Sequence, residues 1–221
     1  MDILTLGPEA PHRVVLFATG AGGDPTRYRP LLERLADEGC RVVAPHFGQF
    51  RVPGRPSESE LLARPRGLVE ALATQADPGT EVVAIGHSIG AWAVLCLAGA
   101  VPQGPDDTPL RTVREPRIRR AVLYAPAAGR FAAPGALDAL TIPLLVLAGG
   151  KDTVTPPEQA LHLRTAPAEV EVRVLPDAGH FAFMHTPPPG ITEAPPSDPA
   201  QLLTEITEAT VRFVSGHPEA R

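Results

Sequence analysis

Several kinds of residue are scarce in this 221-residue chain, and each scarcity excludes a class of protein. Lys151 is the only lysine, and 20 basic residues against 25 acidic ones leave a net charge of −5. That balance lacks the basic surface that nucleic acids require, so we expect no nucleic-acid partner. Two cysteines, Cys40 and Cys96, are too few for a disulfide framework and fit a reducing compartment.

Long hydrophobic runs are also missing. The longest apolar run covers residues 91–101 and is too short to cross a bilayer, so we expect no membrane partner. The segment 1–6 has neither the basic region nor the small-residue cleavage site of an export signal. These observations predict a cytoplasmic protein. The length fits a single α/β domain spanning residues 1–221, with a sizeable core.

Apolar runs rich in β-branched residues alternate with segments of helical periodicity along the chain. This alternation predicts βαβ units, a mostly parallel sheet, and helices on both faces of that sheet. Residues 2–6 are expected to add an antiparallel edge strand. The other strands are expected at 13–18, 41–45, 81–86, 119–124, 143–148 and 169–175, and helices at 24–38, 57–76, 88–100, 157–165 and 200–215.

The segment Gly86-His87-Ser88-Ile89-Gly90 has the pattern G-x-S-x-G, directly after a predicted strand and at the start of a predicted helix. In that context the pattern places a serine on a sharp turn from which its hydroxyl projects. Gly86 and Gly90 remove the Cβ atoms that would crowd the turn. The alternative interpretation is a tight turn without chemistry. His87 is interpreted as a structural neighbour of the serine.

Two further residues complete the order Ser…acid…His along the chain, as in a nucleophile elbow with its triad. Asp152 and His180 each follow a predicted strand, so they and Ser88 fall at the carboxyl ends of parallel strands, where ligands bind in open α/β sheets. We interpret Ser88 as the nucleophile, His180 as its base and Asp152 as the acid. Asp138 and Asp177 compete for the last role, but Asp177 lies too near His180 in the chain to orient it easily.

An oxyanion hole needs two N–H donors where the substrate oxygen becomes negative. Ile89, just after the serine, is expected to supply one backbone donor. The second is expected from the glycine-rich loop 19–23 (TGAGG), whose backbone can approach a ligand closely. This loop is not in the register of a dinucleotide or phosphate loop, so no nucleotide cofactor is expected. The seven histidines show no metal-ligand spacing, which predicts no metal site.

These segments together resemble the α/β-hydrolase superfamily over nearly the full length of the chain, and most of all its small dienelactone-hydrolase-like serine esterases. Residues 14–23 (VVLFATGAGG) resemble the family's strand and its His-Gly-x-x-Gly oxyanion loop, with Thr19 where the family often has histidine. By that match Ala21 is the favoured second N–H donor, and Gly20 is the next choice. True dienelactone hydrolases use a cysteine nucleophile, so Ser88 favours ordinary ester chemistry.

The resemblance also implies an architecture: a three-layer α/β-hydrolase fold with a mostly parallel sheet flanked by helices. Many members carry a cap domain in a connection that here spans only residues 125–142, so we expect one short helix near 134–140 and no substantial cap domain. The segment 43–46 (VAPH) departs from the family's frequent Pro-Asp, which makes His46 a candidate pocket residue. The proline-rich connection 186–199 either borders the pocket entrance or is a stiff surface loop.

Aromatic residues make up only 5% of the chain, yet most phenylalanines gather in predicted loops at strand carboxyl ends. The five in question are Phe47, Phe50, Phe131, Phe181 and Phe183. This grouping predicts an apolar substrate pocket around the triad, with local anchoring of loops as the alternative. Met184 and Trp92 are candidates for the same wall, although Trp92 fits the core equally well.

The hypothesis that unites these features is a serine esterase that cleaves small, soluble carboxylic esters through an acyl-enzyme. Its partner is a small-molecule ester, and the chemistry requires no cofactor. One alternative keeps the triad but acts as a thioesterase or acyltransferase on carrier-bound acyl groups. Another is a non-catalytic binding protein on a hydrolase scaffold, against which the intact set of serine, aspartate and histidine argues.

Overall fold

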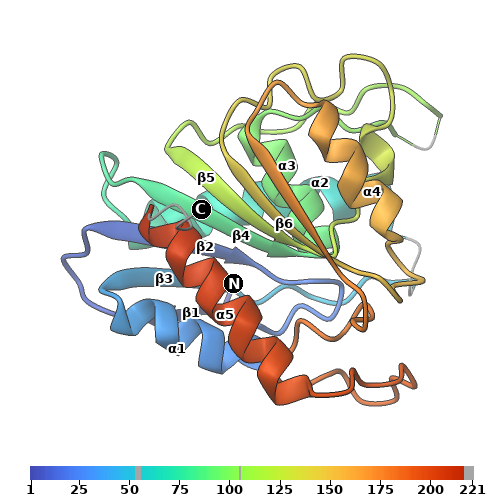
Figure 1. The fold of residues 1–221 in the computed structure, drawn as a ribbon. Coiled ribbons are helices and arrows are strands. Elements are labelled where there is room, and N and C mark those ends of the chain that lie inside the picture. The colour runs from blue at the N-terminus through green and yellow to red at the C-terminus, as the bar shows by residue number, and fades with distance from the viewer. Residues whose placement is uncertain (53–55, 105, 217–221) are drawn as a thin grey trace.

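One sheet organises the computed structural model, which describes residues 1–52, 56–104 and 106–216 (Figure 1). Its strands are β1 (Ile3–Leu6), β2 (Arg13–Ala18), β3 (Cys40–Pro45), β4 (Val82–His87), β5 (Ile118–Tyr124), β6 (Leu144–Gly149) and β7 (Val170–Leu175). They lie in the order β1-β3-β2-β4-β5-β6-β7. All neighbouring pairs are parallel except β1 with β3 at one edge. The expected strands and the antiparallel edge strand are therefore confirmed.

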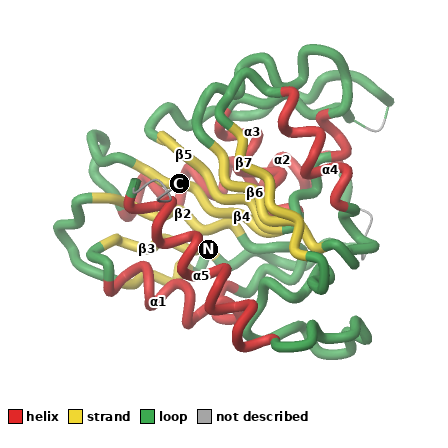
Figure 2. Tube along the Cα trace, in the orientation of Figure 1, coloured by secondary structure: helices red, strands yellow, loops and turns green. Residues whose placement is uncertain are grey.

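Helices cover both faces of the sheet (Figures 1 and 2). On one face lie α1 (Arg29–Asp37) and α5 (Pro199–Ser215), and on the other lie α2 (Glu58–Gln75), α3 (Ile89–Ala98) and α4 (Pro157–His162). Successive side chains of β2 enter opposite layers: Leu16 belongs to the α2–α3 side and Phe17 to the α1–α5 side. Continuous apolar strands such as β2 are thus explained by burial on both faces.

Three helical predictions differ from the structure. The helix expected at 157–165 consists of α4 and a 3-10 helix, Leu163–Thr165. The helix expected at 24–38 is divided into a 3-10 helix, Pro25–Tyr28, and α1, and Asp24 caps the first of these through the Thr26 amide. The prediction of a short helix near 134–140 is wrong, because that segment forms turns. Gly135 adopts φ +79°, a left-handed conformation that does not fit a right-handed helix.

The connection between β5 and β6 bears on access to the sheet edge. Within it the structure has a 3-10 helix, Gly129–Phe131, and turns, with no helical layer of its own. The prediction of a fold without a substantial cap domain is therefore confirmed. Among the described helices, none combines the length and the apolar character that a bilayer crossing requires.

The turn from β4 into α3 packs closely on the end of β2. A Cβ atom on Gly86 would lie 2.6 Å from the backbone of Ala91, and one on Gly90 would lie 2.1 Å from the carbonyl oxygen of Ala18. Such distances are not tolerated between real atoms, so both positions require glycine. The absent side chains allow α3 to begin directly against the sheet.

Gly90→Ala should therefore lower the free energy of unfolding by about 1–3 kcal/mol, because the added methyl group must displace the Ala18 carbonyl. Urea unfolding measures the change. Gly79→Ala is the matched control, since a Cβ there meets no atom within 4 Å. Equal stability of Gly90→Ala and the wild type would contradict the close packing.

Candidate active site

Ser88 sits at the junction of β4 and α3, at the carboxyl edge of the sheet. Its backbone has φ 56° and ψ −121°, a conformation that is strained for any residue with a side chain. Three backbone hydrogen bonds hold it there: its N–H donates to the Tyr124 carbonyl at 2.9 Å, and its carbonyl accepts from the amides of Trp92 and Ala127, each at 3.2 Å. Ser88 as a whole is 9% exposed, so it lies near the surface of the core.

The structure brings the three residues predicted from motif order into one hydrogen-bonded set. His180 Nε2 lies 2.9 Å from Ser88 Oγ, and His180 Nδ1 lies 2.8 Å from Asp152 Oδ2. A carboxylate only accepts, so Nδ1 carries the proton and Nε2 is left to accept from the serine hydroxyl. In this arrangement His180 can remove the serine proton.

Asp152 is 4% exposed and is held as an anion. Burial by itself raises the pKa of this carboxyl, but hydrogen bonds from His180 and Thr155 outweigh burial and lower the pKa below its usual value. Oδ1 accepts from the amides of Val154 and Thr155, each at 2.8 Å, and Oδ2 lies 2.8 Å from the Thr155 hydroxyl.

Thr155 is a site residue that sequence reasoning missed. Its hydroxyl lies 3.1 Å from His180 Nδ1 and 2.9 Å from the carbonyl oxygen of Ala125 at the end of β5. It therefore contacts both the carboxylate and the imidazole of the set. The available signal was the spacing Asp-x-x-Thr in residues 152–155, in which the aspartate caps the turn that places the threonine beside it.

The two competing carboxylates lie elsewhere. Asp177 forms an ion pair with Lys151 and accepts from the Ser197 hydroxyl at 2.6 Å; these contacts hold its pKa far below the usual range. Asp138 is exposed in the turn after Gly135. Asp152 is thus the carboxylate that meets His180.

The predicted oxyanion-hole residues surround Ser88 on two sides. Ile89 is the first residue of α3, where a helix leaves its N–H without an intrahelical partner. A Cβ on Gly20 would lie 3.5 Å from Ser88 Cβ, so the loop after β2 passes directly beside the serine. The backbone amide of Gly20 faces the hydroxyl oxygen of Tyr28 and acts to lower its pKa, although burial raises that pKa by more. Ala21, the next residue of the loop, is exposed.

His87 is buried beside His180 and is neutral. Its Nε2 lies 2.9 Å from the His180 carbonyl, which can only accept, so Nε2 carries the proton and the Tyr28 hydroxyl donates to Nδ1 at 2.7 Å. Burial, together with the charge of nearby His180, lowers the pKa of His87 to about 3. Through Tyr28, the side chain of His87 links the backbone of His180 to the amide of Gly20.

Glu193 anchors the loop that carries His180, and sequence reasoning missed it too. Its carboxylate accepts from the amides of His180 at 2.6 Å and Phe181 at 2.9 Å. Gly179 makes room for it, because a Cβ there would lie 2.2 Å from Glu193 Cδ. The connection 186–199 is therefore attached to the site and is more than a surface loop.

Half of the predicted pocket residues are buried in the core. Trp92 and Phe131 pack together with ring centroids 6.4 Å apart, and Phe183 stacks on Tyr124 at 5.6 Å. Trp92, Phe131 and Phe183 have no appreciable exposure, so the prediction that they line an open pocket is wrong for these three. Met184 is also buried, in the same cluster as Phe183. These side chains fill the layers between sheet and helices.

The other four predicted pocket residues, His46, Phe47, Phe50 and Phe181, are half-buried. The ring of Phe181 meets the ring of His180 edge-on at 5.1 Å. Phe47 and Phe50 flank the guanidinium of Arg64. These four remain predicted contacts of a substrate.

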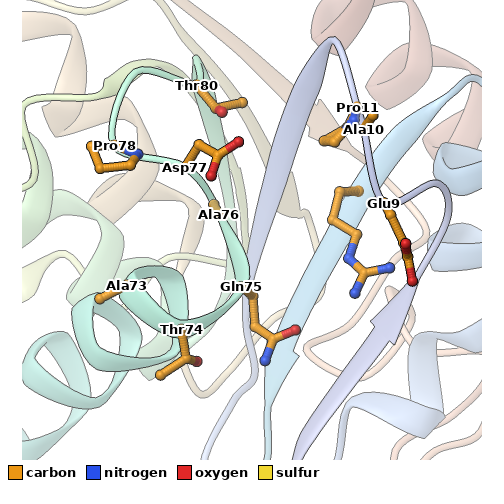
Figure 3. A pocket seen from close by; sticks show the side chains of 11 residues that line it. Glu9, Ala10, Pro11, Ala73, Thr74, Gln75, Ala76, Asp77, Pro78 and Thr80 are labelled. Carbon is orange, nitrogen blue, oxygen red and sulfur yellow. The ribbon is translucent and has the colours of Figure 1, made fainter.

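A hollow of about 610 Å³ lies at the end of the sheet opposite Ser88, where the parallel strands begin (Figure 3). It is bordered by residues 9–11, 73–78 and 80 and by Arg41, near the amino ends of β2 and β4. Ser88, Asp152 and His180 follow the carboxyl ends of β4, β6 and β7, so the hollow does not belong to their site. In the described parts of the chain, no three His, Cys, Asp or Glu side chains gather as metal ligands would.

Comparison with known proteins places this geometry in context. Residues 15–140 match the model of the alpha/beta hydrolase family. A Salmonella typhimurium protein named "Putative carboxymethylenebutenolidase" is 28% identical over 220 residues, which cover 87% of this chain and 75% of that protein. The monoacylglycerol lipase of Paleococcus ferrophilus is similar in structure, with a TM-score of 0.66 and 19% identity over 98% of this chain and 99% of that one. The carboxylesterase of Bacillus cereus is also similar in structure. Its TM-score is 0.63, and its sequence identity is 19% over 99% of this chain and 95% of that one. At such identities the structural likeness shows the fold alone.

The neutral, buried state of His87 predicts a pH dependence of stability. Below pH 6.5 the unfolded chain protonates this histidine, whereas the folded chain resists protonation down to about pH 3. The folded state should therefore lose about 1.4 kcal/mol for each unit that the pH falls through this window. Chemical unfolding at several pH values should show a flatter dependence for His87→Gln. The exposed control His12→Gln should keep the wild-type slope; equal slopes in all three proteins would contradict the assignment.

Removing the Glu193 carboxylate should loosen the His180 loop. Glu193→Ala leaves two amides without their charged acceptor, and we expect it to lower the free energy of unfolding by about 2 kcal/mol. Glu169→Ala, at an exposed position before β7, provides the comparison in the same urea titration. The anchoring role is refuted if both variants unfold at the same urea concentration.

Proposed function

Because this chain belongs to the alpha/beta hydrolase family, we propose that it is a serine hydrolase that cleaves small carboxylic esters through an acyl-enzyme intermediate. One observation supports this above all: Ser88 Oγ, the His180 ring and the Asp152 carboxylate form a continuous hydrogen-bonded line at 2.9 and 2.8 Å. That line lies at the carboxyl edge of the sheet, where ligands bind in open α/β folds.

The proposed reaction has two halves. In the first, His180 takes the proton of Ser88 as Oγ attacks the ester carbonyl, and then gives it to the departing alcohol. In the second, His180 takes a proton from water, whose oxygen attacks the acyl-serine; the acid leaves and Ser88 regains its proton. Asp152 holds the imidazole orientation and stabilises the imidazolium in both halves. Ester and water become acid and alcohol, with no cofactor.

The negative oxygen of each tetrahedral intermediate requires two donors. We propose the backbone N–H of Ile89 as one, because the start of α3 leaves it free and adds the positive end of the helix dipole. The N–H of Ala21 is the proposed second donor. Gly20 is less suited, since its amide already meets the Tyr28 hydroxyl.

The substrate class follows from what surrounds the site. The connection between β5 and β6 holds no cap, so a small ester can approach Ser88 from solvent. The names of the similar structures, a monoacylglycerol lipase and a carboxylesterase, agree with ester chemistry. The half-buried Phe181 beside His180 is a proposed apolar contact for the acyl or alcohol group.

Hydrolysis of p-nitrophenyl esters from acetate to decanoate tests this function. Ser88→Ala should lower kcat by about 10⁶, as expected from other serine triads, and Asp152→Asn by about 10⁴. Ser59→Ala, on the exposed face of α2, is the control. If Ser88→Ala keeps most of the activity, the mechanism is wrong.

Labelling by an organophosphonate separates the alternatives. A wild-type protein that is labelled at Ser88 but hydrolyses none of the esters should be tested on acyl-CoA, and turnover there would indicate a thioesterase or acyltransferase. A protein that is neither labelled nor active would be a binding protein.

A further inference from the structure

Arg64, on α2, is a buried cation beside the oxyanion loop that the proposed reaction leaves without a role. It is 2% exposed, and its Nη1 donates to two carbonyl oxygens of that loop, Thr19 at 3.1 Å and Gly20 at 3.2 Å. In the described parts of the chain no carboxylate pairs with it, and its Nη2 has no hydrogen-bond partner.

Burial of such a group is costly. A buried charge without a counter-ion destabilises a fold, and apolar residues of similar volume often replace buried ions with no loss of stability. Burial lowers the pKa of Arg64 to about 10, so the guanidinium remains charged at neutral pH. Folding alone gives no reason for an arginine at this position.

The hydrogen bonds from Arg64 help to fix the direction of two peptide units, and in the second of them the Gly20 carbonyl also accepts from the Gly23 amide at 3.1 Å. In a trans peptide unit the C=O and the N–H point to opposite sides, and the described chain has no cis peptide bond. Because Arg64 holds the carbonyls of Thr19 and Gly20, the amides of Gly20 and Ala21 face away from it. On that far side the Gly20 amide meets Tyr28, and Gly20 itself borders Ser88. The Ala21 amide is then the donor left for a substrate.

Aromatic rings hold the guanidinium in place. Its central carbon lies 5.0 Å from the ring centroid of Phe47 and 4.7 Å from that of Phe50. The Phe47 amide donates to the carbonyl of Gly23 at 3.0 Å, which ties the same aromatic segment to the end of the oxyanion loop. Arg64 therefore has a fixed position, and its charge acts through the two peptide units in a water-poor environment.

We propose that Arg64 is a positioning residue of the oxyanion hole: it orients the peptide units that carry the Gly20 and Ala21 amides and strengthens the donation of the Ala21 amide to the negative oxygen formed beside Ser88. The proposal rests on the proposed function. A hydrogen bond accepted at a carbonyl polarises the N–H of the same peptide unit, so the unpaired charge enhances the donor on the opposite side. The interaction matters most in the transition state, because only then does the substrate oxygen carry a charge.

The test compares Arg64→Met and Arg64→Lys with Arg66→Met, which removes an exposed arginine two residues further along α2. Measurements are kcat and KM for p-nitrophenyl acetate, the Ki of a trifluoromethyl ketone that forms a negative tetrahedral adduct with serine, and urea unfolding. Arg64→Met should lower kcat by about 10–100-fold, below the loss of a direct oxyanion donor, with KM nearly unchanged. The binding of the ketone should weaken by the same factor.

Arg64→Lys retains the charge and should recover part of the loss, while Arg66→Met should match the wild type in every measurement. The proposal is overturned if Arg64→Met keeps the wild-type kcat and Ki. It is also overturned if activity and unfolding free energy fall together while the Ki of the ketone stays constant, because that pattern describes a structural role.

The outcome is separable from that of the proposed function. If Ser88→Ala is inactive while Arg64→Met is fully active, only the role of Arg64 fails. If the wild type hydrolyses no ester, the rate of phosphonate labelling at Ser88 replaces kcat as the readout. A labelling rate that Arg64→Met leaves unchanged then overturns the proposal, and a 10–100-fold slower rate supports it.

Discussion

The turn from β4 into α3 constrains everything at the carboxyl edge of this sheet. Ser88 occupies it in a left-handed conformation, and glycines on both sides let the helix begin against β2. The same turn lies beside Gly20, and the first amide of α3 follows Ser88 directly without an intrahelical partner. The position of Ser88 itself is thus set by the backbone of this turn.

Around this turn the structure buries several polar groups and satisfies them from neighbouring loops. Asp152 receives hydrogen bonds from its own turn and from His180, while Glu193 holds the amides of the His180 loop from the other direction. His87 connects the backbone of His180 to the hydroxyl of Tyr28. Such a closed network restricts the imidazole ring to one tautomer and one orientation, which proton transfer in both directions requires.

Much of the candidate site could be predicted because local chain geometry encodes it. The order of Ser88, Asp152 and His180, each after a predicted strand, was enough to expect their convergence, since neighbouring parallel strands end at one edge. Residues whose contribution depends on distant contacts were missed. Glu193 is 13 residues from His180 in the sequence, and Arg64 is 45 residues from Thr19. No sequence motif indicates either contact.

The sequence by itself determined the alternation of strands and helices, the antiparallel edge strand, the absence of a cap and the serine turn, because periodicity, glycine placement and connection length are local properties. Only the tertiary structure decided which aromatic residues are accessible: Phe131 and Phe183 follow strands much as Phe181 does, yet packing buries the first two. It also decided that Thr155 and Glu193 contact His180 and where a buried guanidinium lies. Burial and pairing depend on neighbours that are remote along the chain, and those neighbours exist only once the layers have assembled.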